Sequence, residues 1–227
     1  MPHTEPFDRH ADAYDAWFDR NDAAYRSELE AVRALLPRWT RAVEVGVGTG
    51  RFAAPLGIEL GVEPSRPMAE LARARGVRVV EGVAEQLPLD DASFDLVLMV
   101  TTVCFLDDLA KALAEAYRVL EDDGHLLIGF LDRDTEAGRR YHERKSESPF
   151  YKQAEFRSSE EIFADLHRAR FAGLTSVQTI FGRPADMLEP SPVRAGYGTG
   201  LFVVVRARKP GTRDSAPADA GDGPPPR

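Results

Sequence analysis

The stretch Val43-Glu44-Val45-Gly46-Val47-Gly48-Thr49-Gly50 decides the fold of this chain. An apolar strand carries one acidic residue and ends in glycines spaced two apart. Glycines let a backbone pass close to a ligand, because they lack a Cβ atom and tolerate positive φ. In nucleotide-binding α/β units such a turn follows the first strand of a parallel sheet. The stretch therefore predicts an α/β fold with a nucleotide-type ligand at this turn.

The spacing of the acidic residues and glycines favours one class of nucleotide. Glu63 ends the next predicted strand, where a carboxylate can accept hydrogen bonds from both hydroxyls of a ribose. A dinucleotide site requires a glycine at position 51, where a helix N-terminus takes the pyrophosphate. That position is Arg51, and the carboxylate of Glu44 would repel a pyrophosphate. The pattern favours S-adenosylmethionine over NAD, with Glu44 ordering the turn around the positively charged end of the cofactor.

Composition, net charge and cysteine content restrict the possible partners and the cellular compartment of the protein. The chain has 227 residues, 37 acidic and 29 basic, and a net charge of −8, which disfavours a nucleic-acid partner. Cys104 is the single cysteine, so no intrachain disulfide can form and a reducing compartment is expected. Residues 1–10 lack the apolar core of a signal peptide, and no apolar run is long enough to span a membrane. We expect a cytoplasmic protein with no membrane partner.

Hydrophobic periodicity divides the chain into elements. Two leading helices are predicted within residues 1–37. Strands are then predicted over 42–45, 58–63, 77–81, 95–100, 125–130, 174–181 and 201–205. Helices are predicted over 49–56, 64–74, 107–120 and from Ser158 or Ser159 to about 170. The charged segment 132–157 is predicted to form a helical insertion outside the sheet, and the tail 210–227, rich in proline and glycine, is predicted to be disordered.

From about Phe7 to Lys209 the chain resembles class I S-adenosylmethionine-dependent methyltransferases, and more narrowly the branch called methyltransferase type 11. The stretches that carry the resemblance are EVGVGTGRF (44–52), GVEPSRPM (61–68), GVAEQLPL (82–89), SFDLVLMVTTVCFLDD (93–108), EAYRVLEDDGHLLIG (115–129) and SPFYKQAEFRSSEEI (148–162). The resemblance implies a Rossmann-like, seven-stranded, mostly parallel sheet with helices on both faces and an antiparallel last strand. It implies a methyltransferase domain over residues 1–209, with 1–37 as a helical lid.

The resemblance also assigns cofactor-binding residues. It implies the methionine part at Glu44, Gly46 and Gly48, the ribose at Glu63, the adenine ring against Pro64 and Met68, and the adenine edge at Ala84 and Glu85. Family members commonly have an aspartate where this chain has Val83, so the contact with the adenine amino group passes to Glu85 or to a water. A solvated carboxylate is the alternative for Glu85. Thr101 ends the fourth strand, where ligands of parallel sheets bind, and is expected near the methyl group.

The acceptor site is less well marked. Tyr14 and Trp17 in the lid and Tyr141 in the insertion are the candidate substrate-binding residues, and the alternative is that the lid aromatics are ordinary core. Cys104 lies among apolar residues and is expected to be a buried hydrophobe rather than a nucleophile. No general base is predicted, because the histidines are scattered, and no metal ligands are predicted.

These observations predict methyl transfer from S-adenosylmethionine to a small molecule by in-line displacement. Whether O, N, S or C accepts the methyl group stays open, as does the oligomeric state. Two alternatives remain at this point: a noncatalytic module that binds S-adenosylmethionine, and a nicotinamide-dependent oxidoreductase.

Overall fold

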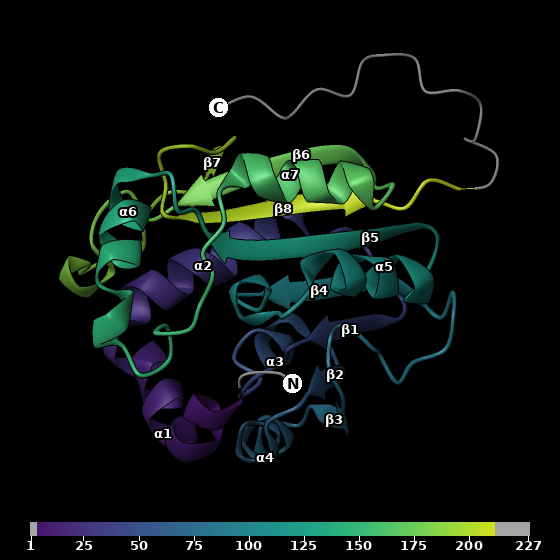
Figure 1. Ribbon diagram of the computed structural model, residues 1–227, viewed down its shortest axis with the longest axis horizontal. Helices are drawn as coiled ribbons and strands as arrows, with labels where there is room; N and C mark the ends of the chain where they lie inside the picture. Colours follow the sequence, from purple (N-terminus) through teal and green to yellow (C-terminus); the bar gives the residue numbers. More distant parts are fainter. Residues whose placement is uncertain (1–3, 212–227) are drawn as a thin grey trace.

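The computed structural model describes residues 4–211 and is centred on an eight-stranded sheet with the order β3-β2-β1-β4-β5-β8-β6-β7 (Figure 1). The strands are β1 (Ala42–Val45), β2 (Leu60–Glu63), β3 (Arg78–Glu81), β4 (Phe94–Val100), β5 (Leu120–Leu131), β6 (Ala172–Thr179), β7 (Arg194–Ala195) and β8 (Phe202–Arg208). Strands β1 to β5 pair in parallel. Strand β8 runs antiparallel to β5, and β6 and β7 continue the antiparallel pairing.

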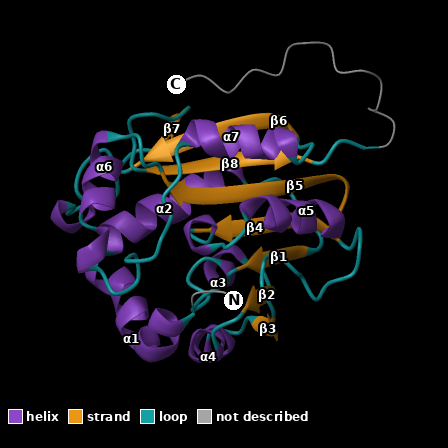
Figure 2. Cartoon of the chain, viewed as in Figure 1, coloured by secondary structure: helices purple, strands orange, loops and turns teal. Residues whose placement is uncertain are grey.

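Helices cover both faces of the sheet (Figure 2). The helices are α1 (Glu5–Arg20), α2 (Asp22–Leu35), α3 (Ala53–Leu56), α4 (Arg66–Ala74), α5 (Leu109–Val119), α6 (Glu136–Glu143) and α7 (Ser159–Arg168), with 3-10 turns η1 (Val103–Phe105), η2 (Lys145–Glu147) and η3 (Pro184–Asp186). Figure 1 shows α5 and α7 in front of the sheet and α2 behind it, while α1 and α6 lie beyond the carboxyl ends of the parallel strands.

The central strand β4 explains why both faces are covered. Its side chains alternate between two apolar clusters, because successive residues of a strand point to opposite faces. Val97 and Met99 pack in the cluster that contains α5 and α7. Leu96 and Leu98 pack in the cluster that contains α1 to α4. The nearly continuous apolar run of β4 is therefore the pattern of a strand buried on both faces.

The predicted fold class is confirmed, with one correction to the strand count. The sheet has eight strands rather than seven, because Arg194 and Ala195 pair with Gln178 and Val177 at its edge. A strand of two exposed residues has no alternating pattern that a sequence could show. The predicted helix 49–56 shortens to Ala53–Leu56, since the glycine turn occupies its first residues, and β5 extends well beyond the predicted 125–130.

A hydrogen-bonded cap determines where helix α7 begins. Ser158 Oγ accepts a hydrogen bond from the Glu161 amide, and the Glu161 carboxylate accepts one from the Ser158 amide, which is the capping box that starts α7. Helix α6 lies within the predicted insertion.

Among residues 4–211, every helix is too short or too polar to cross a lipid bilayer. The predicted tail lies outside the described residues from position 212 onward.

Candidate functional site

The turn after β1 is the first component of the site. Gly46 and Gly48 have φ of +71° and +54°, in the left-handed region that side chains disfavour. A Cβ atom on Gly46 would lie 2.5 Å from the side chain of Thr102. The positive φ favours glycine at both positions, and the close approach of Thr102 leaves no room for a side chain at Gly46. Both residues line a cavity at the carboxyl ends of β1, β2 and β4.

Glu63 holds this turn in place from the end of β2. Its carboxylate accepts hydrogen bonds from the amides of Gly48 at 2.8 Å and Ser65 at 2.9 Å. The side chain is nearly buried, with 7% exposed. Burial raises the pKa of Glu63 to about 7, and the two backbone hydrogen bonds limit that rise. Glu63 thus orders the glycine turn and also presents carboxylate oxygens to the cavity.

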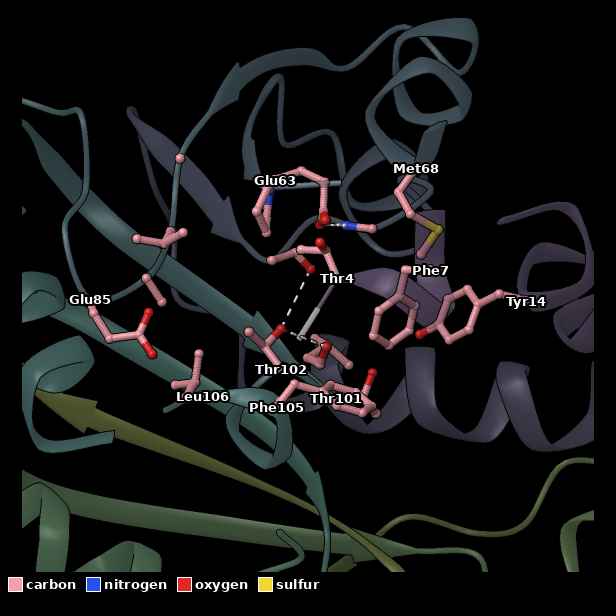
Figure 3. A pocket seen from close by; sticks show the side chains of 17 residues that line it. Thr4, Phe7, Tyr14, Glu63, Met68, Glu85, Thr101, Thr102, Phe105 and Leu106 are labelled. Carbon is pink, nitrogen blue, oxygen red and sulfur yellow. Dashed lines mark hydrogen bonds between the residues drawn. The ribbon is translucent and has the colours of Figure 1, made fainter. Parts of the chain in front are cut away.

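We call this space the glycine-turn cavity (Figure 3). Eight of the nine residues predicted to bind the cofactor line it: Gly46, Gly48, Glu63, Pro64, Met68, Ala84, Glu85 and Thr101. Its free volume is about 90 Å³, which is small for a ligand pocket. Phe7 and Tyr14 lie side by side at one end of it and Glu85 at the other, and Thr4 also lines it. The start of α1 therefore forms one wall of this cavity.

Glu44 is the predicted residue that does not line this cavity. Its side chain is 1% exposed, and burial raises its pKa well above the usual range. Its Oε2 atom has no hydrogen-bond partner among the described residues. Glu44 lies in β1, two residues before Gly46. Its role in ordering the turn around the cofactor stays a prediction.

Glu85 lies at the far end of the glycine-turn cavity and is tied to the loop before α5. Its Oε1 atom accepts hydrogen bonds from the amides of Asp107 at 3.0 Å and Asp108 at 3.4 Å. The carboxylate therefore fixes the wall of the cavity and is not a freely solvated loop group. Its contact with an adenine edge stays a prediction.

A second, larger cavity begins where the first ends. Its volume is about 760 Å³, within the range typical of small-molecule sites. We call it the tyrosine cavity, after Tyr14, Tyr141 and Tyr151. All three predicted substrate-binding residues, Tyr14, Trp17 and Tyr141, line it. They also pack against the apolar core, so their role in binding a substrate stays a prediction.

Tyr14 and Thr101 are the two residues that line both cavities. Thr101 follows β4 with a φ of +51°, and its amide donates to the Gly129 carbonyl at 2.8 Å. Such a conformation is unusual for a β-branched residue and is typical of functional sites. Burial raises the pKa of Tyr14 well above its usual range, so its phenol stays neutral.

Glu28 is a site residue that the sequence analysis missed. It lines the tyrosine cavity from α2, and its side chain is 4% exposed. Burial alone raises the pKa of Glu28 to about 8. One signal could have revealed it: Glu28 lies three residues after Tyr25 and four before Val32, on the face of α2 that carries the apolar stripe.

Ion pairs connect helix α1 to residues near the glycine turn. Arg51 follows the turn and binds Asp15 at 2.7 Å and Asp19 at 2.8 Å, both on α1. Arg75 binds Asp15 at 2.7 Å and donates to the Thr49 carbonyl at 2.8 Å. These contacts hold the pKa of Asp15 well below its usual range. Arg51 thus has a structural role that the sequence analysis did not assign.

The other reactive side chains line neither cavity. Cys104 is 8% exposed, packs against Ala154 and Phe156, and lines neither cavity. Burial raises the pKa of its thiol to about 12, which confirms that it is a buried hydrophobe. None of the described histidines lines either cavity. Among residues 4–211, no three His, Cys, Asp or Glu side chains are grouped as metal ligands.

Part of the chain matches a known protein family. A family model described as "Methyltransferase domain" matches residues 43–128. The matched segment runs from β1 into β5, and it contains the glycine turn, Glu63 and Thr101.

Three similar proteins extend the comparison beyond that segment. An uncharacterised protein of Methanocaldococcus jannaschii is 42% identical over 89% of this chain and 98% of its own length. An uncharacterised protein of Mycobacterium tuberculosis is 40% identical over 71% of this chain, which matches 58% of that longer protein. A crystal structure from Thermotoga maritima, described as a SAM-dependent methyltransferase and possible histamine N-methyltransferase, is 51% identical. It covers 91% of this chain and 99% of its own, with a TM-score of 0.89.

Proposed function

This chain belongs to the class I S-adenosylmethionine-dependent methyltransferases, and we propose that it transfers the methyl group to a small molecule held in the tyrosine cavity. Membership of this family excludes the alternative that the chain is a nicotinamide-dependent oxidoreductase. The observation that carries the proposal is the junction of the two cavities at Tyr14 and Thr101. An acceptor in the larger cavity and a donor in the smaller one would meet at these two residues.

The residues of the glycine-turn cavity fit the cofactor. Gly46 and Gly48 expose backbone to a ligand, and the carboxylate of Glu63 has acceptor capacity beyond its two backbone donors. The unpartnered Oε2 atom of Glu44 lies behind the same turn. When bound, S-adenosylmethionine supplies a methyl group activated by a sulfonium. We propose that Glu63 holds the ribose, with Pro64 and Met68 against the adenine ring.

The role of the protein in methyl transfer is alignment and exclusion of water. Direct displacement requires the nucleophile, the methyl carbon and the sulfur to lie in line, and it requires no nucleophile from the enzyme. Helix α1 carries Tyr14 across both cavities and is held down by the Arg51–Asp15 pair. We infer that α1 opens to admit the cofactor and then shields the reacting atoms.

A small acceptor is supported by the size of the tyrosine cavity and by the charge of the chain. About 760 Å³ suits a compact molecule, and a net charge of −8 disfavours a nucleic acid. The single cysteine supports a cytoplasmic location.

The test is a methyl-transfer assay with S-adenosylmethionine labelled in its methyl group and a panel of small amines, alcohols, thiols and carboxylic acids. Histamine belongs in the panel, because the Thermotoga maritima protein is described as a possible histamine N-methyltransferase. We expect label in at least one small molecule. Tight cofactor binding with no labelled small molecule would instead support the noncatalytic binding module.

A further inference from the structure

The tyrosine cavity contains a buried carboxylate without a partner. Among residues 4–211, no hydrogen-bond donor or cation pairs with Glu28, although its side chain is 4% exposed and lines the cavity. A buried carboxylate is normally paired, because removing its charge from water carries a large free-energy penalty. The unpaired state of Glu28 therefore points to a partner that comes from outside the chain.

The basic side chains of the cavity do not serve as that partner, because each has one of its own. Arg140 binds Glu136 at 2.6 Å, and Arg144 binds Glu147 at 2.7 Å. The remaining ones are Arg183, which binds Asp186 at 3.5 Å, Lys145, which donates to the Ala154 carbonyl at 2.8 Å, and Arg20, which donates to the Ala13 carbonyl at 3.4 Å.

Aromatic rings surround the same space. Tyr14 packs edge-on against Phe150 with 5.3 Å between ring centroids, and Tyr141 packs edge-on against Tyr151 at 5.9 Å. Trp17 lines the cavity from α1. The faces of such rings attract cations, and more strongly when water is excluded. A carboxylate among aromatic rings is therefore a binding site for an organic cation and disfavours an anion.

We propose that the acceptor is a protonated amine, that Glu28 binds its ammonium group, and that Glu28 takes up the proton that must leave before methylation. This inference rests on the proposed function, because it assigns the substrate class of the same site. It also identifies nitrogen as the atom that is methylated. A neutral alcohol would leave Glu28 without a charged partner, and an acid would be repelled by it.

An ammonium group must lose a proton before its nitrogen can accept a methyl group. One N–H bond breaks and its proton passes to a carboxylate oxygen of Glu28, which leaves a lone pair on nitrogen. That lone pair forms the C–N bond while the C–S bond of the donor breaks, and the electron pair of that bond stays on sulfur. The products are a methylated ammonium and a thioether, and Glu28 returns its proton to water.

Burial suits Glu28 to this exchange, because a general base works best when its pKa lies near the working pH. With a pKa of about 8, the carboxyl group of Glu28 is largely neutral at pH 6 and ionised at pH 9. The facing tyrosines, Tyr14, Tyr141 and Tyr151, have pKa values raised by burial and stay neutral over this range. The facing charged side chains are Arg20, Glu136, Arg140, Glu143, Arg144, Lys145, Glu147 and Arg183.

The test measures amine binding rather than turnover, so that it can fail separately from the proposed function. Melting temperature is followed with saturating S-adenosylhomocysteine, with histamine or 2-phenylethylamine, and with the neutral counterpart 2-phenylethanol. For the wild type we expect an amine to raise the melting temperature by roughly 5 °C at saturation, and the alcohol to have little effect. Glu28→Gln is expected to lose the amine shift, and Glu28→Asp to keep part of it. Glu30→Gln, an exposed position on the same helix, is the matched control.

A pH series adds a readout that a purely structural residue would not change. Amine affinity of the wild type is expected to rise as the pH rises towards about 8, because Glu28 ionises over that range, and Glu28→Gln is expected to lack this dependence. With an amine that accepts the methyl group, kcat/KM of Glu28→Gln is expected to fall by about 100-fold or more. Absence of any amine shift in the wild type, or equal shifts in wild type and Glu28→Gln, would overturn the inference.

The melting temperature of Glu28→Gln without ligand shows whether this variant is folded. The folded-state pKa of Glu28 is raised from 4.5 to about 8, so its ionisation destabilises the folded state progressively as the pH rises between these values. The glutamine side chain of Glu28→Gln does not ionise, so this variant does not lose stability in this way. Its melting temperature without ligand is therefore expected to gain on the wild type from pH 5 to pH 8, and loss of the amine shift in such a protein cannot be attributed to unfolding.

Discussion

The glycine-turn cavity and the tyrosine cavity meet at Tyr14 and Thr101 but are built differently. The first is lined mainly by residues of the turns that follow β1, β2, β3 and β4, with the start of α1 on one side. The second is lined by residues of α1, α2, α6 and the loops around η2 and η3. One cavity is therefore determined by short local sequence, whereas the other depends on how segments distant in sequence pack together.

Their buried carboxylates show the same difference. Glu63 accepts two backbone hydrogen bonds that favour its charged form, and its pKa rises only to about 7. Glu28 has no such donors, and its pKa rises to about 8. Backbone amides therefore stabilise the charged form of Glu63, whereas no described residue donates a hydrogen bond to Glu28.

The largest expected effect comes from filling the glycine-turn cavity at Gly48. Gly48→Val places a branched side chain where the backbone faces the cofactor, at a φ of +54°, and we expect S-adenosylmethionine binding to fall below detection in calorimetry. Gly57→Val is the control, because Gly57 has a φ of +77° but no heavy atom within 4 Å of its added Cβ. It carries the backbone strain without the obstruction. Equal affinities for the two variants would show that the turn does not contact the cofactor.

The next effect concerns Glu63. Glu63→Ala removes a charged acceptor, and hydrogen bonds to charged groups contribute about 1.5–3 kcal/mol, so cofactor affinity is expected to fall by roughly 10- to 150-fold. Because the pKa of Glu63 is about 7, affinity of the wild type is expected to rise as the pH increases through 7. Glu63→Gln is expected to lack this dependence. Glu59→Ala, at an exposed position before β2, serves as the control in the same calorimetric series.

This difference explains how much of the site the sequence could predict. Glycine spacing and an acidic residue at a strand end are local patterns with a definite geometric consequence, and they are enough to identify Gly46, Gly48 and Glu63. The buried run of β4 predicted both its position and the location of Thr101. The structure brings these residues to one cavity because the position of each depends on a few neighbouring residues, and their contacts with the cofactor stay predictions.

The remaining residues depend on packing that no short window contains. The spacing of Glu28 places it on the apolar face of α2, but only the packing of the helices shows that this part of the face lines a cavity. Arg51 was interpreted only as a missing glycine, since its partner Asp15 lies 36 residues away. Strand β7 was missed because two residues have no periodicity. A cavity near Tyr14 could therefore be expected from the sequence, but the charged residues that line the tyrosine cavity could not.

A smaller effect is expected from loosening the lid. Asp15→Asn weakens the pairing of α1 with Arg51 and Arg75 while leaving the residues of the glycine turn unchanged. Water exclusion acts on the transition state, so we expect kcat to fall about tenfold with less than a threefold change in cofactor affinity. Asp12→Asn, exposed on the same helix, is the control. Parallel losses of kcat and affinity would mean that α1 is ordinary core and not a lid.

The smallest effect is expected at Cys104, which lies next to the junction of the two cavities in sequence but lines neither. Its thiol donates weakly to the Thr101 carbonyl at 3.5 Å, and burial raises its pKa to about 12, so no thiolate is present at neutral pH. Cys104→Ala removes one buried sulfur, and we expect a modest loss of stability with methyl transfer kept within about threefold, because displacement at a sulfonium needs no enzyme nucleophile. Reaction of the wild type with a thiol reagent is expected to be slow until the protein unfolds. Near-complete loss of turnover in a folded Cys104→Ala protein that still binds S-adenosylmethionine would show that Cys104 takes part in the reaction, and the acceptor site would then extend past Thr101 towards η1.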